Sequence, residues 1–163
     1  MSHQTNTQFI ISRCIGYGTL RLSLGVNMLM HGLMRLAPDT HAAFVDGVAA
    51  RFADTVLPGW LLIGFAYSIP LIEFSIGILL IPGLLTRTGL TIGSLLMAAF
   101  IFGQCLIQNW QTAHFVMIYA LTYFVLFYFI DYNAFSLDGL IRIKLNKRPS
   151  YIQVLDKGPA TPR

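Results

Sequence analysis

Four apolar stretches, each close to the length of a membrane span, constrain what this chain can fold into. They cover residues 14–36, 59–82, 88–110 and 114–132 of the 163-residue sequence. A helix needs about 20 mainly apolar residues to cross the hydrocarbon core of a bilayer. Charged residues make up only 11% of the chain, against about 25% in soluble domains. The sequence therefore predicts an integral membrane protein that contacts the lipid bilayer.

The connections between these stretches predict how the helices are arranged. Residues 83–87 and 111–113 form short connections, and short connections make neighbouring helices antiparallel. We therefore expect an all-α protein built as a membrane four-helix bundle. The first connection, residues 37–58, is longer, and Phe44, Val48 and Phe52 recur in it every four residues. This spacing predicts a short amphipathic helix in the first outer loop, with Asp39 or Thr40 as its N-terminal capping residue. The helix would act as a structural cap over the bundle or as a gating lid.

The distribution of Lys and Arg predicts the orientation and the domains. Arg13, Arg87 and the basic residues from Arg142 onward fall on one side of the predicted membrane, with Arg35 and Arg51 on the other. Because cytoplasmic flanks carry the excess of Lys and Arg, both termini are expected in the cytoplasm. The expected domains are a cytoplasmic tail (1–13), a transmembrane domain (14–133), and an interfacial segment with a disordered tail (134–163). Topology accounts for the positive charge, so no nucleic-acid partner is expected.

A single carboxylate, Glu73, lies in the middle of the second apolar stretch. A charged side chain at this depth is costly and needs a partner. Counted from the predicted helix ends, Arg21 on the first helix lies at a matching depth, at a rise of about 1.5 Å per residue. We therefore predict an Arg21–Glu73 ion pair, with bidentate guanidinium–carboxylate contact. The pair is a candidate catalytic centre, or a buried bridge that fixes the helix register.

A second set of polar residues is expected in the outer half of the bundle. Asn27 and His31 lie one turn apart on the first helix, Gln104 and Gln108 one turn apart on the third, and His114 opens the fourth. They are candidates for binding a small polar head group such as a quinone carbonyl, or they hydrogen-bond to one another. His31 and His114 also permit axial haem ligation, which is disfavoured because neither lies near the middle of the bundle. No His/Cys cluster has zinc-site spacing.

The pattern of spaced residues along the helices resembles that of a known family. The first helix reads LRLSLGVNMLMHGLMRL, the second contains EFSIGILLIPGLLTRTGL, and YNAFSLDGLI follows the fourth. These motifs resemble the DoxX/DoxD-like family of small four-helix membrane proteins, over about residues 15–141. The residues that match are Arg21, Gly25, Gly32, Glu73, Gly77, Gly83, Arg87 and Asp138, with Arg35 where many members have lysine.

The resemblance implies a bacterial inner-membrane protein and two functional hypotheses. The first is a membrane subunit of a redox system linked to the quinone pool, of the thiosulfate:quinone oxidoreductase type. Its electron donor would be a separate redox subunit, because no partner domain is fused to this chain. The second is a non-catalytic scaffold or chaperone-like module that recruits or stabilises partner proteins. Homo-oligomerisation remains open under both hypotheses.

Overall fold

The protein is entirely helical over the part of the chain that the structure describes. A computed structural model describes residues 2–145, with side chains from residue 7 onward. It contains α1 (Ser2–Leu36), α2 (Pro38–Arg51), α3 (Gly59–Leu80), α4 (Thr86–Leu106), α5 (Trp110–Tyr128), the short 3₁₀ helix η1 (Ile130–Tyr132) and α6 (Leu137–Lys144). The predicted all-α class is confirmed for these residues. The predicted disordered tail, from residue 146 onward, lies outside them.

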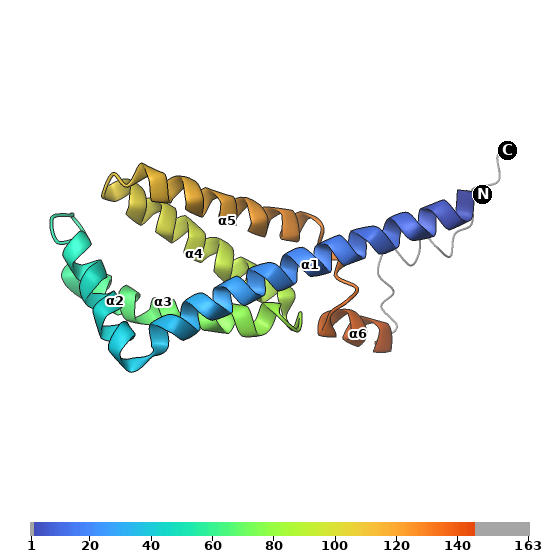
Figure 1. The fold of residues 1–163 in the computed structure, drawn as a ribbon, viewed down its shortest axis with the longest axis horizontal. Coiled ribbons are helices and arrows are strands. Elements are labelled where there is room, and N and C mark those ends of the chain that lie inside the picture. Colours follow the sequence, from blue (N-terminus) through green and yellow to red (C-terminus); the bar gives the residue numbers. More distant parts are fainter. Residues whose placement is uncertain (1, 146–163) are drawn as a thin grey trace.

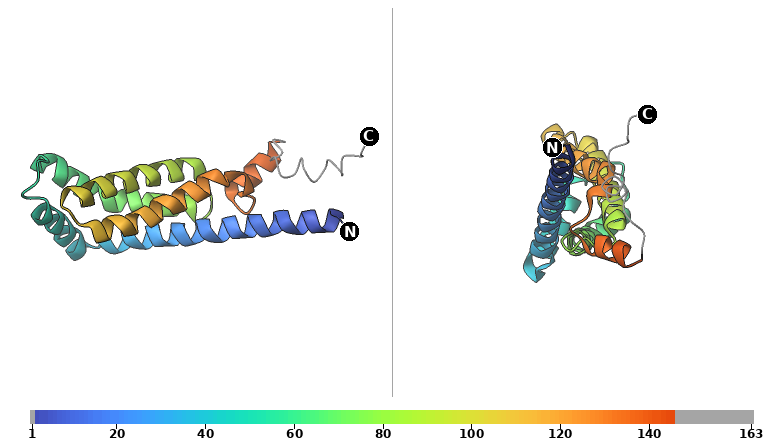
Figure 2. Two further views of the ribbon diagram at one scale, coloured as in Figure 1. Left: turned by 90° about the horizontal axis from the view of Figure 1, so that it is seen from above. Right: turned by 90° about the vertical axis from the view of Figure 1, so that its right-hand side faces the viewer.

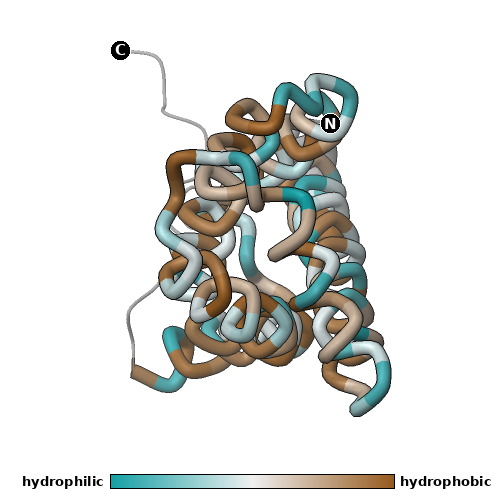
Figure 3. The backbone as a smooth tube through the Cα atoms, turned by 90° about the vertical axis from the view of Figure 1, so that its left-hand side faces the viewer, coloured by the Kyte–Doolittle hydropathy of each residue, from teal (hydrophilic) through white to brown (hydrophobic). Residues whose placement is uncertain are grey.

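Three helices are long and apolar enough to cross a membrane. They are α3, α4 and α5, with 22, 21 and 19 residues. Large apolar side chains point outward on each of them: Leu71 is 55% exposed, Leu95 is 67% exposed and Ile118 is 60% exposed. Seen from the end where α2 lies, hydrophobic segments recur around the molecule (Figure 3). Such surfaces are stable in hydrocarbon and unfavourable in water, so this is a multi-pass membrane protein.

The first helix does not meet the same criterion, so four spans are not established. α1 is 35 residues long, and it packs along α3, as α3 does along α4 and α4 along α5. Its N-terminal half projects past the ends of α3, α4 and α5 (Figures 1 and 2). The helix begins at Ser2 and runs through residues 13 and 14 without a break. The proposed domain division therefore has no visible boundary there and stays a prediction.

Glycines let α1 and α3 approach closely. A Cβ atom on Gly32 would lie 2.6 Å from the carbonyl oxygen of Pro70, and one on Gly77 would lie 2.6 Å from Cα of Leu29. Gly25 lies against Leu80 and Ile81 in the same way. Small residues permit such backbone contact between membrane helices. These contacts fix the antiparallel register, in which the last turns of α1 lie beside the middle of α3.

α2 is the short helix that the sequence predicts in the first long loop. It lies across the end of the molecule where α1 leads into α3 (Figure 1), which we call the α2 end. Pro38 occupies its first turn and Ala37 precedes it, with no side-chain cap. The predicted capping by Asp39 or Thr40 is therefore wrong. The Thr40 hydroxyl instead donates to the carbonyl oxygens of Met34 and Ala37. The helix start needs no side-chain cap at proline, because proline already supplies a helical φ and lacks an N–H.

The opposite end, which we call the α6 end, is held by polar contacts, some of them buried. Both carboxylate oxygens of Asp138 accept from backbone N–H groups at the start of α4, those of Leu85 and Thr86, at 2.9 and 2.7 Å. Ser136 caps α6 by accepting from the N–H of Gly139 at 2.9 Å. Asn133 Nδ2 donates to the Thr86 hydroxyl at 3.0 Å. A carboxylate at a helix N-terminus is stabilised by unpaired N–H groups and the helix dipole, so Asp138 ties the C-terminal segment to α4.

Candidate functional site

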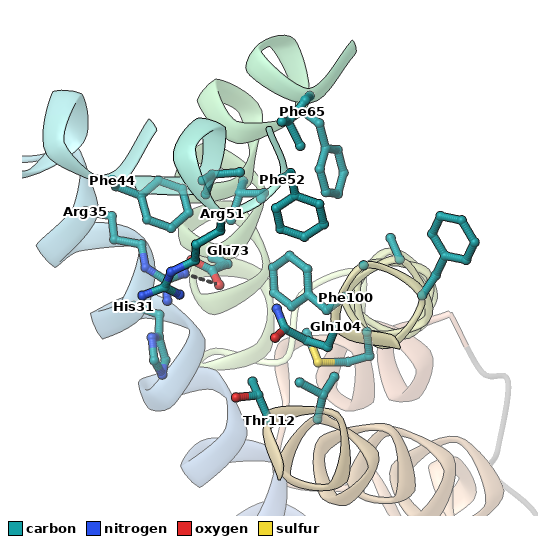
Figure 4. A pocket seen from close by; sticks show the side chains of 18 of the residues that line it. His31, Arg35, Phe44, Arg51, Phe52, Phe65, Glu73, Phe100, Gln104 and Thr112 are labelled. Atoms are coloured by element: carbon teal, nitrogen blue, oxygen red, sulfur yellow. Dashed lines mark hydrogen bonds and ion pairs between the residues drawn. The ribbon is translucent and has the colours of Figure 1, made fainter. Parts of the chain in front are cut away.

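A cavity of about 540 Å³ opens among α1, α2, α3, α4 and α5 toward the α2 end. Its volume falls in the range of about 300–1,000 Å³ that is typical of small-molecule sites. Most of its wall is apolar, and seven aromatic side chains contribute to it: Phe44, Phe52, Phe65, Phe100, Phe102, Phe115 and Tyr119. Six polar side chains also line it: His31, Arg35, Arg51, Glu73, Gln104 and Thr112. Figure 4 shows this arrangement from close by.

α2 supplies one wall of the cavity through the face that the sequence pattern predicts. Phe44, Val48 and Phe52 all line the cavity. The Phe52 ring also reaches α4, where a Cβ atom on Gly103 would meet it at 3.2 Å. The four-residue spacing places these side chains on one side of a helix. The apolar face of α2 therefore faces the other helices and the cavity.

Glu73 forms an ion pair with Arg35. Arg35 Nη1 donates to Glu73 Oε1 at 2.7 Å and to Oε2 at 2.6 Å. The Glu73 side chain is only 3% exposed, whereas that of Arg35 is 29% exposed. The Arg35 guanidinium also lies over the Phe44 ring, 4.8 Å from its centroid, within the range of a cation–π contact. The pair joins the end of α1 to the middle of α3 and forms part of the cavity wall.

The predicted Arg21–Glu73 pair is wrong. Arg21 lies at the α6 end, where its Nη1 donates to the carbonyl oxygens of Leu80 and Ile81 and its Nη2 donates to that of Phe135 at 2.7 Å. The prediction measured depth from an assumed entry of the first helix at Arg13. The glycine contacts between α1 and α3 instead place Arg21 beside the C-terminal end of α3. There the guanidinium donates to carbonyls at the C-terminal end of α3, which lack a partner further along the helix, and to the carbonyl of Phe135.

Arg51 gives the polar wall an excess of positive charge. It lies at the end of α2, is exposed, and points toward the Arg35–Glu73 pair (Figure 4). Both carboxylate oxygens of Glu73 already accept from Arg35. Among the described residues, no carboxylate lies in ion-pair distance of Arg51. With two guanidinium groups and one carboxylate, the wall carries a formal charge of +1 when His31 is neutral.

Gln104 and Thr112 approach the cavity from α4 and α5. Gln104 Oε1 is buried, and no hydrogen-bond partner for it exists among the described residues. The oxygen and nitrogen of a glutamine amide are assigned from their partners, so this amide presents an unpaired polar group in either orientation. A buried polar group without a partner is unfavourable. It is therefore a point at which a bound molecule would gain a hydrogen bond.

The other predicted site residues are not brought together. Asn27, Gln108 and His114 do not line the cavity, whereas His31 and Gln104 do. Gln108 lies in the turn after α4 with φ of 55°, and His114 is exposed on α5. The cavity therefore does not place His31 opposite His114, as axial haem ligation would require. Among the described residues, no three His, Cys, Asp or Glu side chains form a group that could hold a metal ion.

The residues that sequence reasoning missed carry most of the cavity's charge. Arg35 follows His31 by one helical turn, a spacing that places both on one face, and both line the cavity. We interpreted Arg35 and Arg51 only as flanking charges that set orientation. Nothing in the sequence shows that α2 folds back so that Arg51 meets Arg35. Thr112 was missed because it lies in the short connection predicted between two spans.

Together, the membrane helices and the cavity define a multi-pass membrane protein with an internal cavity at one end. Comparison with protein families identifies its group. Residues 13–117, well over half of the chain, match the family described as "Methylamine utilisation protein MauE". The chain belongs to the MauE family, and the assignment to the DoxX/DoxD-like family was wrong. The spaced glycines behind that resemblance are residues that close helix packing favours in any membrane bundle.

The match covers α1 from Arg13, all of α2, α3 and α4, and the first part of α5. It therefore includes every residue that lines the cavity except Tyr119. No curated protein and no solved structure matched the chain significantly. The thiosulfate:quinone oxidoreductase type of function has no support from the family that matches.

Proposed function

We propose that this chain is a membrane accessory protein of a redox-linked, methylamine-utilisation type of system, and that its cavity binds a small molecule with polar and apolar parts. The observation that carries the proposal is the Arg35–Glu73 pair in the wall of a cavity of about 540 Å³. Ionisable residues within membrane helices are costly and usually mark functional sites. The family description supplies the class of system.

The proposed topology is a bacterial inner-membrane protein with both termini in the cytoplasm. Arg13, Arg87, Arg142 and Lys144 cluster toward the α6 end, and Arg35 and Arg51 lie toward the α2 end. Cytoplasmic flanks carry more Lys and Arg, which favours a cytoplasmic α6 end. In this arrangement α1 crosses the membrane in addition to α3, α4 and α5, and it enters the membrane near Arg21. The cavity then opens on the outer side.

A quinone is the second candidate occupant of the cavity. Its flat ring would suit the aromatic wall, and its two carbonyl oxygens would accept from donors on opposite sides, Arg51 on one and Gln104 on the other. This keeps the link to the quinone pool that the sequence suggested, without assigning a reaction to the chain. A separate redox subunit as partner, and a homo-oligomer, likewise remain predictions.

The experiment compares a substitution that fills the cavity with the same substitution on the outside of the same helix. Ala99 is half-buried and lines the cavity, and its neighbour Ala98 is exposed on the outside of α4. We expect Ala99→Phe to abolish complementation of a deletion strain grown with methylamine as the only nitrogen source. Ala98→Phe should complement fully, with both proteins present in the membrane at equal amounts. A pure scaffold role predicts equal growth of the two strains, and that result would reject the proposed function.

A further inference from the structure

We infer that the cavity binds an anionic group, a carboxylate or phosphate, carried on an apolar body, and that Arg51 is its principal binding residue. This inference rests on the proposed function and names the ligand class of the same site. The first observation behind it is the charge of the cavity wall. Arg51 and Arg35 both point into the space beside Glu73, whose two oxygens are occupied by Arg35.

Two neighbouring guanidinium groups repel one another unless an anion lies between them. Glu73 supplies one such anion, and its side chain is only 3% exposed. Guanidinium groups bind carboxylates and phosphates through parallel hydrogen bonds. A second anion beside Arg51 would therefore complete the pairing of the cations. A cationic ligand is disfavoured, because it would face two arginines and a carboxylate that is already paired.

The rest of the cavity is suited to an apolar body. The wall beyond the charged group consists mainly of aromatic and aliphatic side chains, among them Phe65, Phe100 and Phe115. Burial of apolar surface contributes about 25 cal/mol for each Å², so affinity would come from the body and orientation from the head group. The unpaired amide of Gln104 lies across from the charged wall (Figure 4). It offers a hydrogen bond to a second polar atom of the ligand.

Two sources supply this chemistry, and the test separates them. One is the bilayer, as a fatty acid or an anionic phospholipid. The other is the aqueous phase, as a small aromatic acid. Each probe is paired with an uncharged analogue of the same body: palmitate with hexadecanol, phosphatidylglycerol with diacylglycerol, and 3-phenylpropionate with 3-phenylpropanol. Binding to the full-length protein in nanodiscs of neutral lipid is measured with radiolabelled probes at alkaline pH, where both acids are ionised.

We expect at least one anionic probe to bind wild-type protein about tenfold more tightly than its neutral analogue, the effect of one charge-assisted hydrogen bond. Arg51→Gln should remove this preference and leave the affinity for the neutral analogue unchanged. Arg51→Lys should retain part of it, because the charge remains. Arg87→Gln, which removes an exposed arginine from the α6 end, is the matched control and should bind like wild type. The pair that shows selectivity identifies the source.

Equal binding of acid and neutral analogue in all three pairs would overturn the inference. So would tighter binding of a neutral quinone analogue that Arg51→Gln leaves unchanged. If Arg51→Gln fails to fold, as judged by circular dichroism and gel filtration, the comparison of Arg51→Lys with wild type decides, and unchanged selectivity would again overturn it. These outcomes are independent of growth on methylamine. The Ala99→Phe strain tests the proposed function, and the ratio of acid to neutral binding tests the ligand class.

Discussion

Arg35 and Glu73 connect the last turn of α1 to the middle of α3 through one nitrogen, Arg35 Nη1, which donates to both oxygens of the carboxylate. The pair lies where α1 ends and α2 begins, so it also positions the turn between them. Phe44 on α2 packs against the same guanidinium, 4.8 Å from ring centroid to Cζ. One buried interaction thereby fixes three helices around the cavity.

Removal of Glu73 should destabilise the protein more than removal of the whole pair. Glu73→Gln leaves the Arg35 charge without its partner, and breaking a buried ion pair costs about 3–5 kcal/mol. We expect the lower end of this range, because the Arg35 side chain is 29% exposed. The double variant Arg35→Met with Glu73→Gln should recover much of the loss. Unfolding in mild detergent measures each free energy.

The matched control for this cycle is Arg21. Arg21 donates to backbone carbonyls at the α6 end and not to Glu73. Arg21→Gln and Glu73→Gln should therefore have additive effects, within about 0.5 kcal/mol. A coupling energy between Arg21 and Glu73 as large as that between Arg35 and Glu73 would contradict the pairing seen here.

Arg21 should stabilise the junction between α3 and the C-terminal segment. Its guanidinium bridges the carbonyl oxygens of Leu80, Ile81 and Phe135, and hydrogen bonds to charged groups contribute about 1.5–3 kcal/mol. We expect Arg21→Met to lower the free energy of unfolding by about 2–4 kcal/mol, and Arg21→Lys to restore it only in part, because ammonium lacks the planar fork. Limited proteolysis should show earlier cleavage near η1 and α6. Unchanged proteolysis would reject a role in this junction.

Asp138 should act as a cap for α4 from a distance in the sequence. Its two oxygens accept from the N–H groups of Leu85 and Thr86. Asp138→Ala should cost about 1–2 kcal/mol, the usual effect of losing an N-terminal cap. Asp138→Asn keeps one acceptor but loses the charge that favours the helix N-terminus, so its loss should be intermediate. Thermal unfolding of the three proteins gives the order, and equal stability of wild type and Asp138→Ala would exclude capping.

The glycine contacts should determine the α1–α3 register. Gly32→Ala and Gly77→Ala place a methyl group against the backbone of the facing helix, and overpacking costs about 1–3 kcal/mol or more. Gly16→Ala and Gly64→Ala are the controls, because a Cβ added at either position meets no atom of another part of the described chain within 4 Å. These two should leave stability unchanged or raise it by up to about 1 kcal/mol. The prediction fails if all four variants unfold alike.

Cysteine labelling should establish the proposed orientation. The two free cysteines, Cys14 and Cys105, are first replaced by alanine. A single cysteine is then introduced at Asp54 near the α2 end or at Leu145 near the α6 end. A membrane-impermeant maleimide added to intact cells should label Asp54→Cys only. Labelling of Leu145→Cys should require permeabilised cells. The reverse pattern would place both termini outside.

The helices and their membrane environment follow from sequence patterns alone. The length and apolarity of residues 59–82, 88–110 and 114–132 predict α3, α4 and α5 with ends within about four residues, because a span must satisfy its backbone hydrogen bonds within one helix. The repeat of Phe44, Val48 and Phe52 predicts α2 and the face it presents. Glu73 stands out as a candidate site residue from its position in the sequence, since a carboxylate in an apolar run is costly wherever it lies.

Which residues come into contact depends on how the helices pack. We predicted Arg21 as the partner of Glu73 from an assumed level at which α1 enters the membrane, whereas the structure pairs Glu73 with Arg35. The contacts of Gly25, Gly32 and Gly77 fix that level, because two helix backbones approach this closely only where a glycine on one of them carries no side chain. The return of α2 then brings Arg51 to the cavity. Helix register and loop path depend on contacts between distant residues, which local sequence patterns do not specify.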